Sequence, residues 1–216
     1  MLKHDDSTPN TVPLVIGVTS HRNIPAHEVE PIRRRVREFF VQLQHDFPAL
    51  PLVVLSALAE GGDQLVAEEA LAVGARLIAP LPLPRTLYVE DFHHSATHAT
   101  IDALCAHAQV INLPLLSDST HEGIGTHGPQ RNRQYGQAGV FIARHCHLLL
   151  AIWDGKTTAR LGGTAQVAEY FLSGVMPGLT ERRRGGRHHL LGSGDERLVC
   201  QIVCSRDTDD GAPLSP

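Results

Sequence analysis

The chain has 216 residues, of which 42% are hydrophobic and 19% are charged, and its formal net charge is -4 at pH 7. This length provides for one sizeable hydrophobic core, and the acidic balance argues against the broad basic surface typical of nucleic-acid-binding domains. No run approaches the roughly 18 apolar residues of a membrane span, and residues 1–10 are polar and acidic, unlike a secretory signal. We therefore expect a cytoplasmic protein with no membrane partner and no nucleic acid partner.

Short apolar runs alternate with segments of helical periodicity along the chain. Strands are predicted, in chain order, at residues 12–18, 52–57, 76–79, 109–113, 147–153 and 198–204. Helices are predicted at residues 27–46, from the turn at 61–63 to a stop at Gly74, and at 96–107, 130–144 and 163–172. This alternation predicts an α/β fold: a three-layer, Rossmann-like, doubly wound and mainly parallel sheet of about six or seven strands.

The predicted elements form a single domain over residues 11–205, with a disordered lead at 1–10 and a tail at 206–216. Residues 117–129 are rich in Gly, His, Ser and Thr and show no helical or strand period, as in a functional or disordered loop. Residues 181–197 are rich in Arg, Gly and His and are interpreted as a surface loop. Because open parallel sheets bind ligands at the carboxyl ends of their strands, the residues that follow each strand are candidate site residues.

The turn after the first strand has the composition of a phosphate-binding turn. Gly17 allows a ligand to approach the backbone closely. Thr19, Ser20 and Arg22 supply hydrogen-bond donors that suit an anion. The alternative is an ordinary turn at the end of a strand.

The turn after the second strand places paired glycines at the start of a helix. Gly61 and Gly62, with Ser56 and Glu60 beside them, would leave the first N–H groups of that helix pointing at an anion, and the helix dipole adds to this attraction. Asp63 belongs either to this anion cradle or to a simple N-cap. We favour a bound phosphate, because an N-cap does not require two glycines before it.

A third turn follows the fifth predicted strand, where Gly162, Gly163 and Thr164 open a helix. Asp154 leaves that strand and is a candidate acceptor for a ribose hydroxyl, and Glu169 lies about one and a half turns into the helix. The alternatives are a tight turn at Asp154 and a solvated helix face at Glu169. We favour ligand binding, because three such turns recur in one predicted sheet.

The helix before the fifth strand begins with three further candidates. Arg131 and Arg133 are candidates to clamp a phosphate, and Tyr135 is a candidate to stack on a base. The alternative is that all three are exposed helix residues. The pattern alone does not decide between these alternatives.

No metal or cofactor is expected. The four cysteines form no C-x-x-C pair and are interpreted as reduced, mostly buried thiols. The 14 histidines include no H-E-x-x-H pattern, so the solvated-surface interpretation is preferred. The dinucleotide fingerprint G-x-G-x-x-G, the G-K-[ST] element of NTPases and the G-x-S-x-G elbow are also absent.

The three turns, in this order, resemble the SLOG superfamily, which unites the DNA-uptake protein DprA/Smf with the LOG "lysine decarboxylase-like" phosphoribohydrolases. The resemblance covers about residues 12–204 and is carried by VIGVTSHR, by SALAEGGDQLVAEEAL and by the segment that ends in LGGTAQVAEYF. It implies a Rossmann-like fold that binds a nucleotide or nucleotide derivative, with phosphates on the glycine turns. Several bacterial conflict-system proteins of this superfamily are thought to sense such ligands.

The last segment departs from the LOG pattern P-G-G-x-G-T-x-x-E. Leu161 stands in place of the proline, Thr164 directly follows Gly163, and Glu169 lies five residues beyond that threonine instead of three. In an active phosphoribohydrolase an arginine of the preceding helix works with the glutamate, a role that would fall here to Arg133 or Arg131. These departures favour ligand binding over catalysis.

Three functions remain open from the sequence. The first is binding or sensing of a nucleotide-derived phosphate ligand, with a homodimer as the assembly that related phosphoribohydrolases imply. The second is N-glycosidic hydrolysis of a nucleoside monophosphate, with Glu169, Arg133 and Asp154 as candidate catalytic residues. The third is DprA-like binding of single-stranded DNA, against which the acidic balance and the scarcity of aromatic residues argue.

Overall fold

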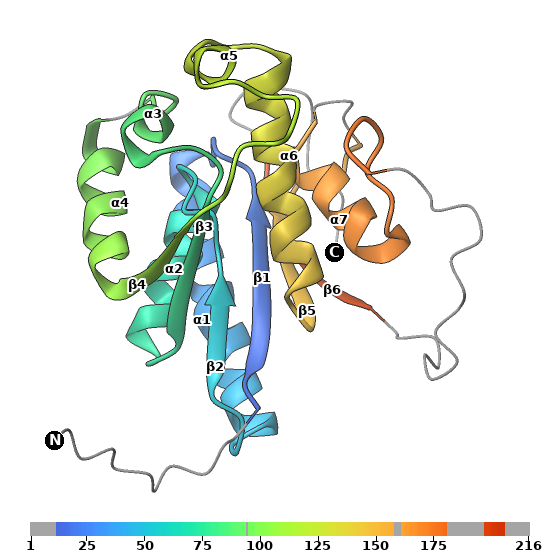
Figure 1. Ribbon diagram of the computed structural model, residues 1–216. Coiled ribbons are helices and arrows are strands. Elements are labelled where there is room, and N and C mark those ends of the chain that lie inside the picture. Colours follow the sequence, from blue (N-terminus) through green and yellow to red (C-terminus); the bar gives the residue numbers. More distant parts are fainter. Residues whose placement is uncertain (1–11, 94, 158–160, 181–196, 206–216) are drawn as a thin grey trace, which may run out of the picture.

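The computed structural model describes residues 12–93, 95–157, 161–180 and 197–205 (Figure 1). The predicted lead, the predicted tail and nearly all of the predicted loop at 181–197 lie outside these residues. The strands are β1 (Leu14–Ser20), β2 (Leu52–Leu55), β3 (Arg76–Leu81), β4 (Ala108–Asn112), β5 (Leu148–Trp153) and β6 (Leu198–Val203). The helices are α1 (Ala26–Asp46), α2 (Gly62–Ala72), α3 (Arg85–Val89), α4 (Ser95–His107), α5 (His121–Gly125), α6 (Pro129–Arg144) and α7 (Thr164–Ser173).

The six strands form one parallel sheet in the order β4-β3-β2-β1-β5-β6. The chain winds outward from β1 in one direction through β2, β3 and β4, and then returns to the other side of β1 to place β5 and β6. The switch point of this doubly wound topology therefore lies between β1 and β5, where ligands of open α/β sheets bind. The predicted fold class is confirmed.

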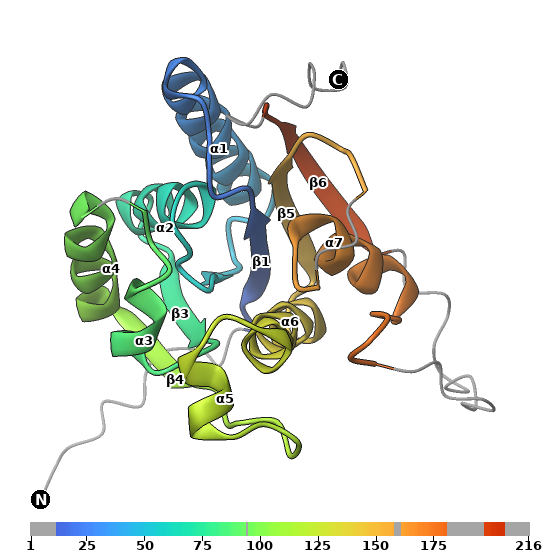
Figure 2. The same ribbon diagram turned by 90° about the horizontal axis from the view of Figure 1, so that it is seen from above.

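Helices cover both faces of the sheet, as Figure 2 shows from above. On one face α1, α2 and α4 pack over side chains such as Ile16, Val54 and Leu150. On the other face α6 and α7 pack over Leu55 and Leu149. Both faces of the central strands are buried, which explains why these strands are continuous apolar runs and not alternating ones.

The structure corrects three local predictions. Two short helices were missed: α3, and α5 within the segment 117–129 that was predicted to have no regular structure. Five residues are too few to show a helical period, although Thr120 caps α5 by accepting a hydrogen bond from the Gly123 N–H at 3.0 Å. The third strand also continues through Pro80, where it was predicted to end.

Pro80 is tolerated in β3 because of the direction in which its nitrogen faces. The Ile78 carbonyl accepts from the Ser56 N–H on the β2 side, and residues two apart in a strand present their backbone groups to the same side. The Pro80 nitrogen therefore faces a position beyond the end of β2 at Leu55, where no ladder hydrogen bond is lost.

Candidate functional site

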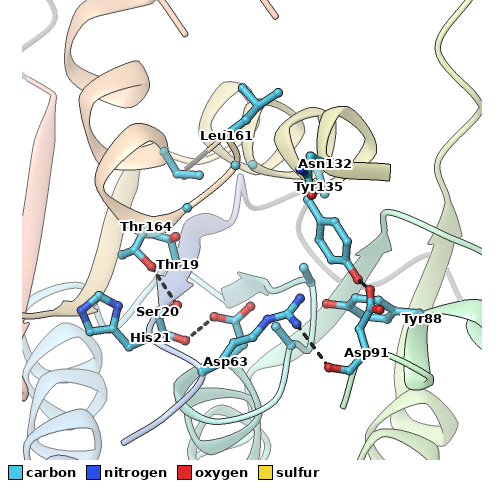
Figure 3. Close-up of a pocket in the computed structure, with 18 of the residues that line it drawn as sticks. Thr19, Ser20, His21, Asp63, Tyr88, Asp91, Asn132, Tyr135, Leu161 and Thr164 are labelled. Atoms are coloured by element: carbon cyan, nitrogen blue, oxygen red, sulfur yellow. Dashed lines mark hydrogen bonds between the residues drawn. The ribbon is translucent and has the colours of Figure 1, made fainter. Parts of the chain in front are cut away.

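A cavity of about 450 Å³ opens at the carboxyl end of β1, beside the switch point of the sheet. We call it the strand-edge cavity. Its walls are the end of β1, the start of α2, the segment from Tyr88 to Asp91, one face of α6 and the turn that opens α7 (Figure 3). The predicted site residues that line it are Thr19, Ser20, Arg22, Asp63, Arg131, Tyr135, Gly162, Gly163 and Thr164.

The start of α7 forms one end of the strand-edge cavity. Gly163 is the N-cap and offers no side chain to the helix. The backbone N–H groups of Thr164 and Ala165 have no acceptor among the described residues, and both residues line the cavity. Unpaired amides at a helix start, together with the helix dipole, attract an anion.

Gly162 is required in this turn by close packing. Gly162 has φ +75°, and a Cβ atom there would lie 2.6 Å from the backbone nitrogen of Gly136 in α6. The Thr164 hydroxyl donates to the Ser20 carbonyl at 2.7 Å, which fixes the turn to the end of β1. The turn is therefore held between α6 and β1 at the wall of the cavity.

A buried carboxyl group lies in the middle of the strand-edge cavity. Asp63 accepts a hydrogen bond from the Ser20 hydroxyl at 2.6 Å (Figure 3) and is only 5% exposed. Burial raises the pKa of Asp63 to about 6, although the hydrogen bonds from Ser20 and from the Ala59 N–H and the charge of Arg22 oppose this rise. Asp63 is therefore a carboxyl group that changes charge near neutral pH.

Arg22 supplies positive charge to the cavity. Its guanidinium group lies 5.1 Å from the centroid of the Tyr135 ring, within the range of a cation–π contact. Its Nη1 donates to the Asp91 carbonyl at 3.4 Å. These contacts place a cation in the cavity wall beside Tyr135 and Asp91, where it can attract a phosphate or stack on a base.

Tyr88 and Asp91 form the other end of the cavity and were missed by the sequence analysis. Tyr88 is fully buried, and its hydroxyl has no hydrogen-bond partner within the described residues. Asp91 accepts from the Tyr135 hydroxyl and, at 3.0 Å, from Arg131 Nε. The sequence carried a signal for both residues. All strands of a parallel sheet end at its ligand-binding edge, so the segment after the third predicted strand also begins there.

The anion cradle predicted at Gly61, Gly62 and Asp63 stays a prediction, and the structure gives the two glycines a packing role. The Gly62 N–H donates to the His21 carbonyl at 3.1 Å, and the carboxyl group of Asp63 occupies the start of α2. A Cβ atom on Gly61 would lie 2.0 Å from the Arg22 carbonyl oxygen, and one on Gly62 would lie 2.6 Å from the Ser20 Cβ. The paired glycines therefore let α2 pack against the exit of β1, which is a structural requirement.

Three other predicted ligand residues have structural contacts and do not line the strand-edge cavity. Ser56 accepts from the Leu58 N–H at 3.1 Å. Glu60 is buried and accepts from the His93 N–H at 2.9 Å. Gly17 lies so close to Cys146 that a Cβ atom would be 2.6 Å from its sulfur.

The predicted catalytic trio of Glu169, Arg133 and Asp154 is not brought together. Glu169 is exposed on α7, because five residues from Thr164 turn a side chain about 140° around the helix axis. Arg133 pairs with Asp118 and lies outside the cavity. Asp154 is buried at 2% exposure, where it contacts His21 Nε2 at 3.1 Å and accepts from the Lys156 N–H.

Arg131 lines the cavity but is already engaged. Its side chain is 3% exposed, and it donates to Asp91, to the Ile124 carbonyl and to the Leu87 carbonyl. These bonds join α6 to α5 and to the end of α3. Arg131 therefore holds the Tyr88–Asp91 wall in place, and the interpretation as a phosphate clamp does not apply.

A second cavity of about 480 Å³ adjoins the first, between α1, α2 and α4. The two share Arg22, Asn23 and His93 in their walls. The polar groups of the second cavity include Arg33 and Glu68, which bond each other at 2.9 Å. The site thus continues past Arg22 toward α4.

None of the helices that the structure describes is long and apolar enough to cross a membrane. No group of three or more His, Cys, Asp or Glu side chains in the described ranges is placed to hold a metal ion. The absence of metal and cofactor stays a prediction.

No protein-family model matches the chain, and no curated protein matches it. Two similar solved structures are DNA processing protein A (DprA) from Streptococcus pneumoniae and from Helicobacter pylori. The first is 16% identical with a TM-score of 0.44, and the match covers 74% of this chain and 47% of that one. The second is 14% identical with a TM-score of 0.45, and the match covers 74% of this chain and 62% of that one.

Both similar structures belong to the DprA side of the resemblance, whereas the LOG side stays a prediction. The Helicobacter pylori structure is described as giving insight into a single-stranded DNA binding mode. The expectation that nucleic acid is not a partner is therefore corrected. The net charge of -4 is a sum over the whole chain, and it does not report the local charge at a strand edge.

Proposed function

We propose that this protein binds a nucleotide or a nucleotide-derived phosphate ligand in the strand-edge cavity. The observation that carries the proposal is the pair of unpaired amides at Thr164 and Ala165, two residues that line the same cavity as Arg22. Amides at a helix start suit a phosphate, and an arginine adds charge and bidentate hydrogen bonds. The volume of about 450 Å³ lies in the range of small-molecule sites.

The geometry does not support hydrolysis by the residues predicted to be catalytic. A phosphoribohydrolase needs a carboxylate beside the glycosidic bond, and the glutamate assigned to that role, Glu169, is exposed on the outer face of α7. Asp63 is the carboxyl group that lines the cavity near its centre, and it is hydrogen-bonded to Ser20. We therefore propose a binding or sensing role.

The test is calorimetric titration of the full chain with nucleoside mono-, di- and triphosphates. Arg22→Gln should weaken binding on the order of 10- to 100-fold, because the positive charge that Arg22 brings to the cavity wall is lost. The matched control is Arg34→Gln, since Arg34 is 73% exposed on α1 and lies outside both cavities. Absence of binding by any nucleotide, or equal binding by the two variants, would refute the proposal.

Single-stranded DNA is a second candidate ligand. The observation in this chain that favours it is the second cavity, which adjoins the first through Arg22, Asn23 and His93 and so offers space for a neighbouring nucleotide. Fluorescence anisotropy with a labelled oligonucleotide of about ten nucleotides tests it. A strand that binds more tightly than its mononucleotide, with affinity that falls as salt rises, supports this candidate. Equal affinity of strand and mononucleotide contradicts it.

A further inference from the structure

Two buried polar atoms without partners lie at the end of the strand-edge cavity opposite α7. The Tyr88 side chain is 0% exposed, and its hydroxyl has no hydrogen-bond partner among the residues that the structure describes. The Asp91 side chain is 7% exposed, and its Oδ1 likewise has none there. A buried polar group without a partner is destabilising, so two of them in one cavity wall point to a ligand that supplies the missing hydrogen bonds.

The charges around these atoms determine what they can bind. Burial raises the pKa of Asp91, but hydrogen bonds from Arg131 and Tyr135 and the charge of Arg22 outweigh it and hold that pKa below its ordinary value. Asp91 is therefore an ionised carboxylate near neutral pH, and Oδ1 only accepts hydrogen bonds. Burial raises the pKa of Tyr88 well above its ordinary value, so its hydroxyl keeps its proton and is available as a donor.

One protein group approaches Asp91 Oδ1 without satisfying it. His127 Nδ1 lies 3.6 Å away, and the histidine side chain is 86% exposed. A nitrogen at that distance on a solvated side chain does not form a hydrogen bond of normal length. The carboxylate oxygen is therefore buried without a hydrogen bond of normal length from the described residues.

The position of these atoms relative to α7 indicates which part of a nucleotide reaches them. In Figure 3, Thr164 lies on one side of the cavity, Tyr88 and Asp91 lie on the other, and Asp63 lies between them. A nucleotide with its phosphate on the α7 amides would place its sugar near Asp63 and its base at the Tyr88–Asp91 end. The base edge is the part of a nucleotide that carries adjacent donors and acceptors.

We propose that Tyr88 and Asp91 select a nucleobase that carries an exocyclic amino group beside a ring nitrogen acceptor, as adenine and cytosine do. The amino group donates to Asp91 Oδ1, and the ring nitrogen accepts from the Tyr88 hydroxyl. The selection rests on the proposed function, since it requires a nucleotide in the strand-edge cavity. A base without the amino group leaves the buried carboxylate oxygen unpaired, which is the type of mismatch that polar sites reject most strongly.

The first experiment measures dissociation constants for AMP and CMP and for analogues that lack only the amino group. These analogues are purine riboside 5′-monophosphate and pyrimidin-2-one riboside 5′-monophosphate, and ribose 5-phosphate serves as the ligand without a base. AMP or CMP should bind on the order of 10- to 100-fold more tightly than its analogue, because the lost hydrogen bond involves a charged group. Equal affinity of each nucleotide and its analogue overturns the inference while leaving phosphate binding intact. Absence of all binding overturns the proposed function as well.

The second experiment uses Tyr88→Phe, which removes only the hydroxyl. Since that hydroxyl has no partner in the described chain, the variant without ligand should melt at the same or a higher temperature than the wild type. Its affinity for the preferred nucleotide should fall about 3- to 10-fold, and its affinity for ribose 5-phosphate should not change. A lower melting temperature with unchanged nucleotide affinity would mean that the hydroxyl is structural, and the inference would be wrong.

Discussion

Replacement of Asp63 by asparagine is expected to stabilise the protein at neutral pH. Asp63 is 5% exposed, and burial raises its pKa from 3.8 to about 6. This pKa difference means that ionisation of Asp63 lowers the free energy of unfolding at pH 7 by about 3 kcal/mol. The asparagine amide has the same shape and keeps one oxygen that accepts the hydrogen bonds of this site, but it carries no charge. Asp63→Asn should therefore raise the free energy of unfolding at pH 7 by up to about 3 kcal/mol.

The gain should depend on pH in a defined direction. Because the folded-state pKa lies above the unfolded one, the folded protein holds its proton at pH values where the unfolded chain has already released it. The stability of the wild type relative to Asp63→Asn is thus highest below pH 3.8 and falls as pH rises through about 6. At pH values above about 6, the difference in free energy of unfolding between Asp63→Asn and the wild type reaches its full size.

Urea unfolding followed by circular dichroism, at several pH values from about 4 to about 7, measures this difference. Asp102→Asn is the matched control, because Asp102 is 49% exposed and pairs with Arg85 on the surface. Its effect should stay within about 1 kcal/mol. If Asp63→Asn gives no gain at pH 7, or the same gain at pH 4 as at pH 7, then burial of an ionised Asp63 is not what determines the difference.

Two further substitutions test the packing that shapes the cavity. Gly62→Ala should lower the free energy of unfolding by about 1–3 kcal/mol, because its Cβ would lie 2.6 Å from the Ser20 Cβ. Gly125→Ala in α5 is the control, with nothing within 4 Å in the described part of the chain, and equal thermal melting of the two variants would contradict the packing argument. Arg131→Met should be destabilising by about 3–5 kcal/mol in urea unfolding, because it leaves the Asp91 carboxylate buried without its closest cation. A loss below about 1 kcal/mol would show that Arg131 does not hold that wall.

The sheet was predictable from the sequence because its central strands carry continuous apolar runs. Residues 147–153 and 52–57 contain almost no polar side chain, and both faces of the strands they form are buried by helices. The boundaries differ by one or two residues, since strand ends depend on where neighbouring strands stop. Pro80 illustrates this, because whether it ends β3 depends on the length of β2.

The site was only partly predictable, because glycine pairs have two causes that sequence does not separate. Gly162 and Gly163 open a helix toward the cavity, whereas Gly61 and Gly62 allow α2 to pack against β1. Both pairs have the same local pattern, and only the neighbouring backbone distinguishes them. Tyr88 was missed for a different reason, since it belongs to a five-residue helix that leaves no periodic signal.

The backbone at the end of β1 is bonded to three other segments. The Ser20 carbonyl accepts from Thr164, the His21 N–H donates to the Ile152 carbonyl, and the His21 carbonyl accepts from Gly62. Through these bonds β5, α7 and α2 all meet one dipeptide, so the floor of the cavity is preorganised before any ligand arrives. A preorganised site orders few groups on binding, which favours association without a slow conformational step. Rapid-mixing experiments should then show a single binding phase whose rate rises linearly with ligand concentration.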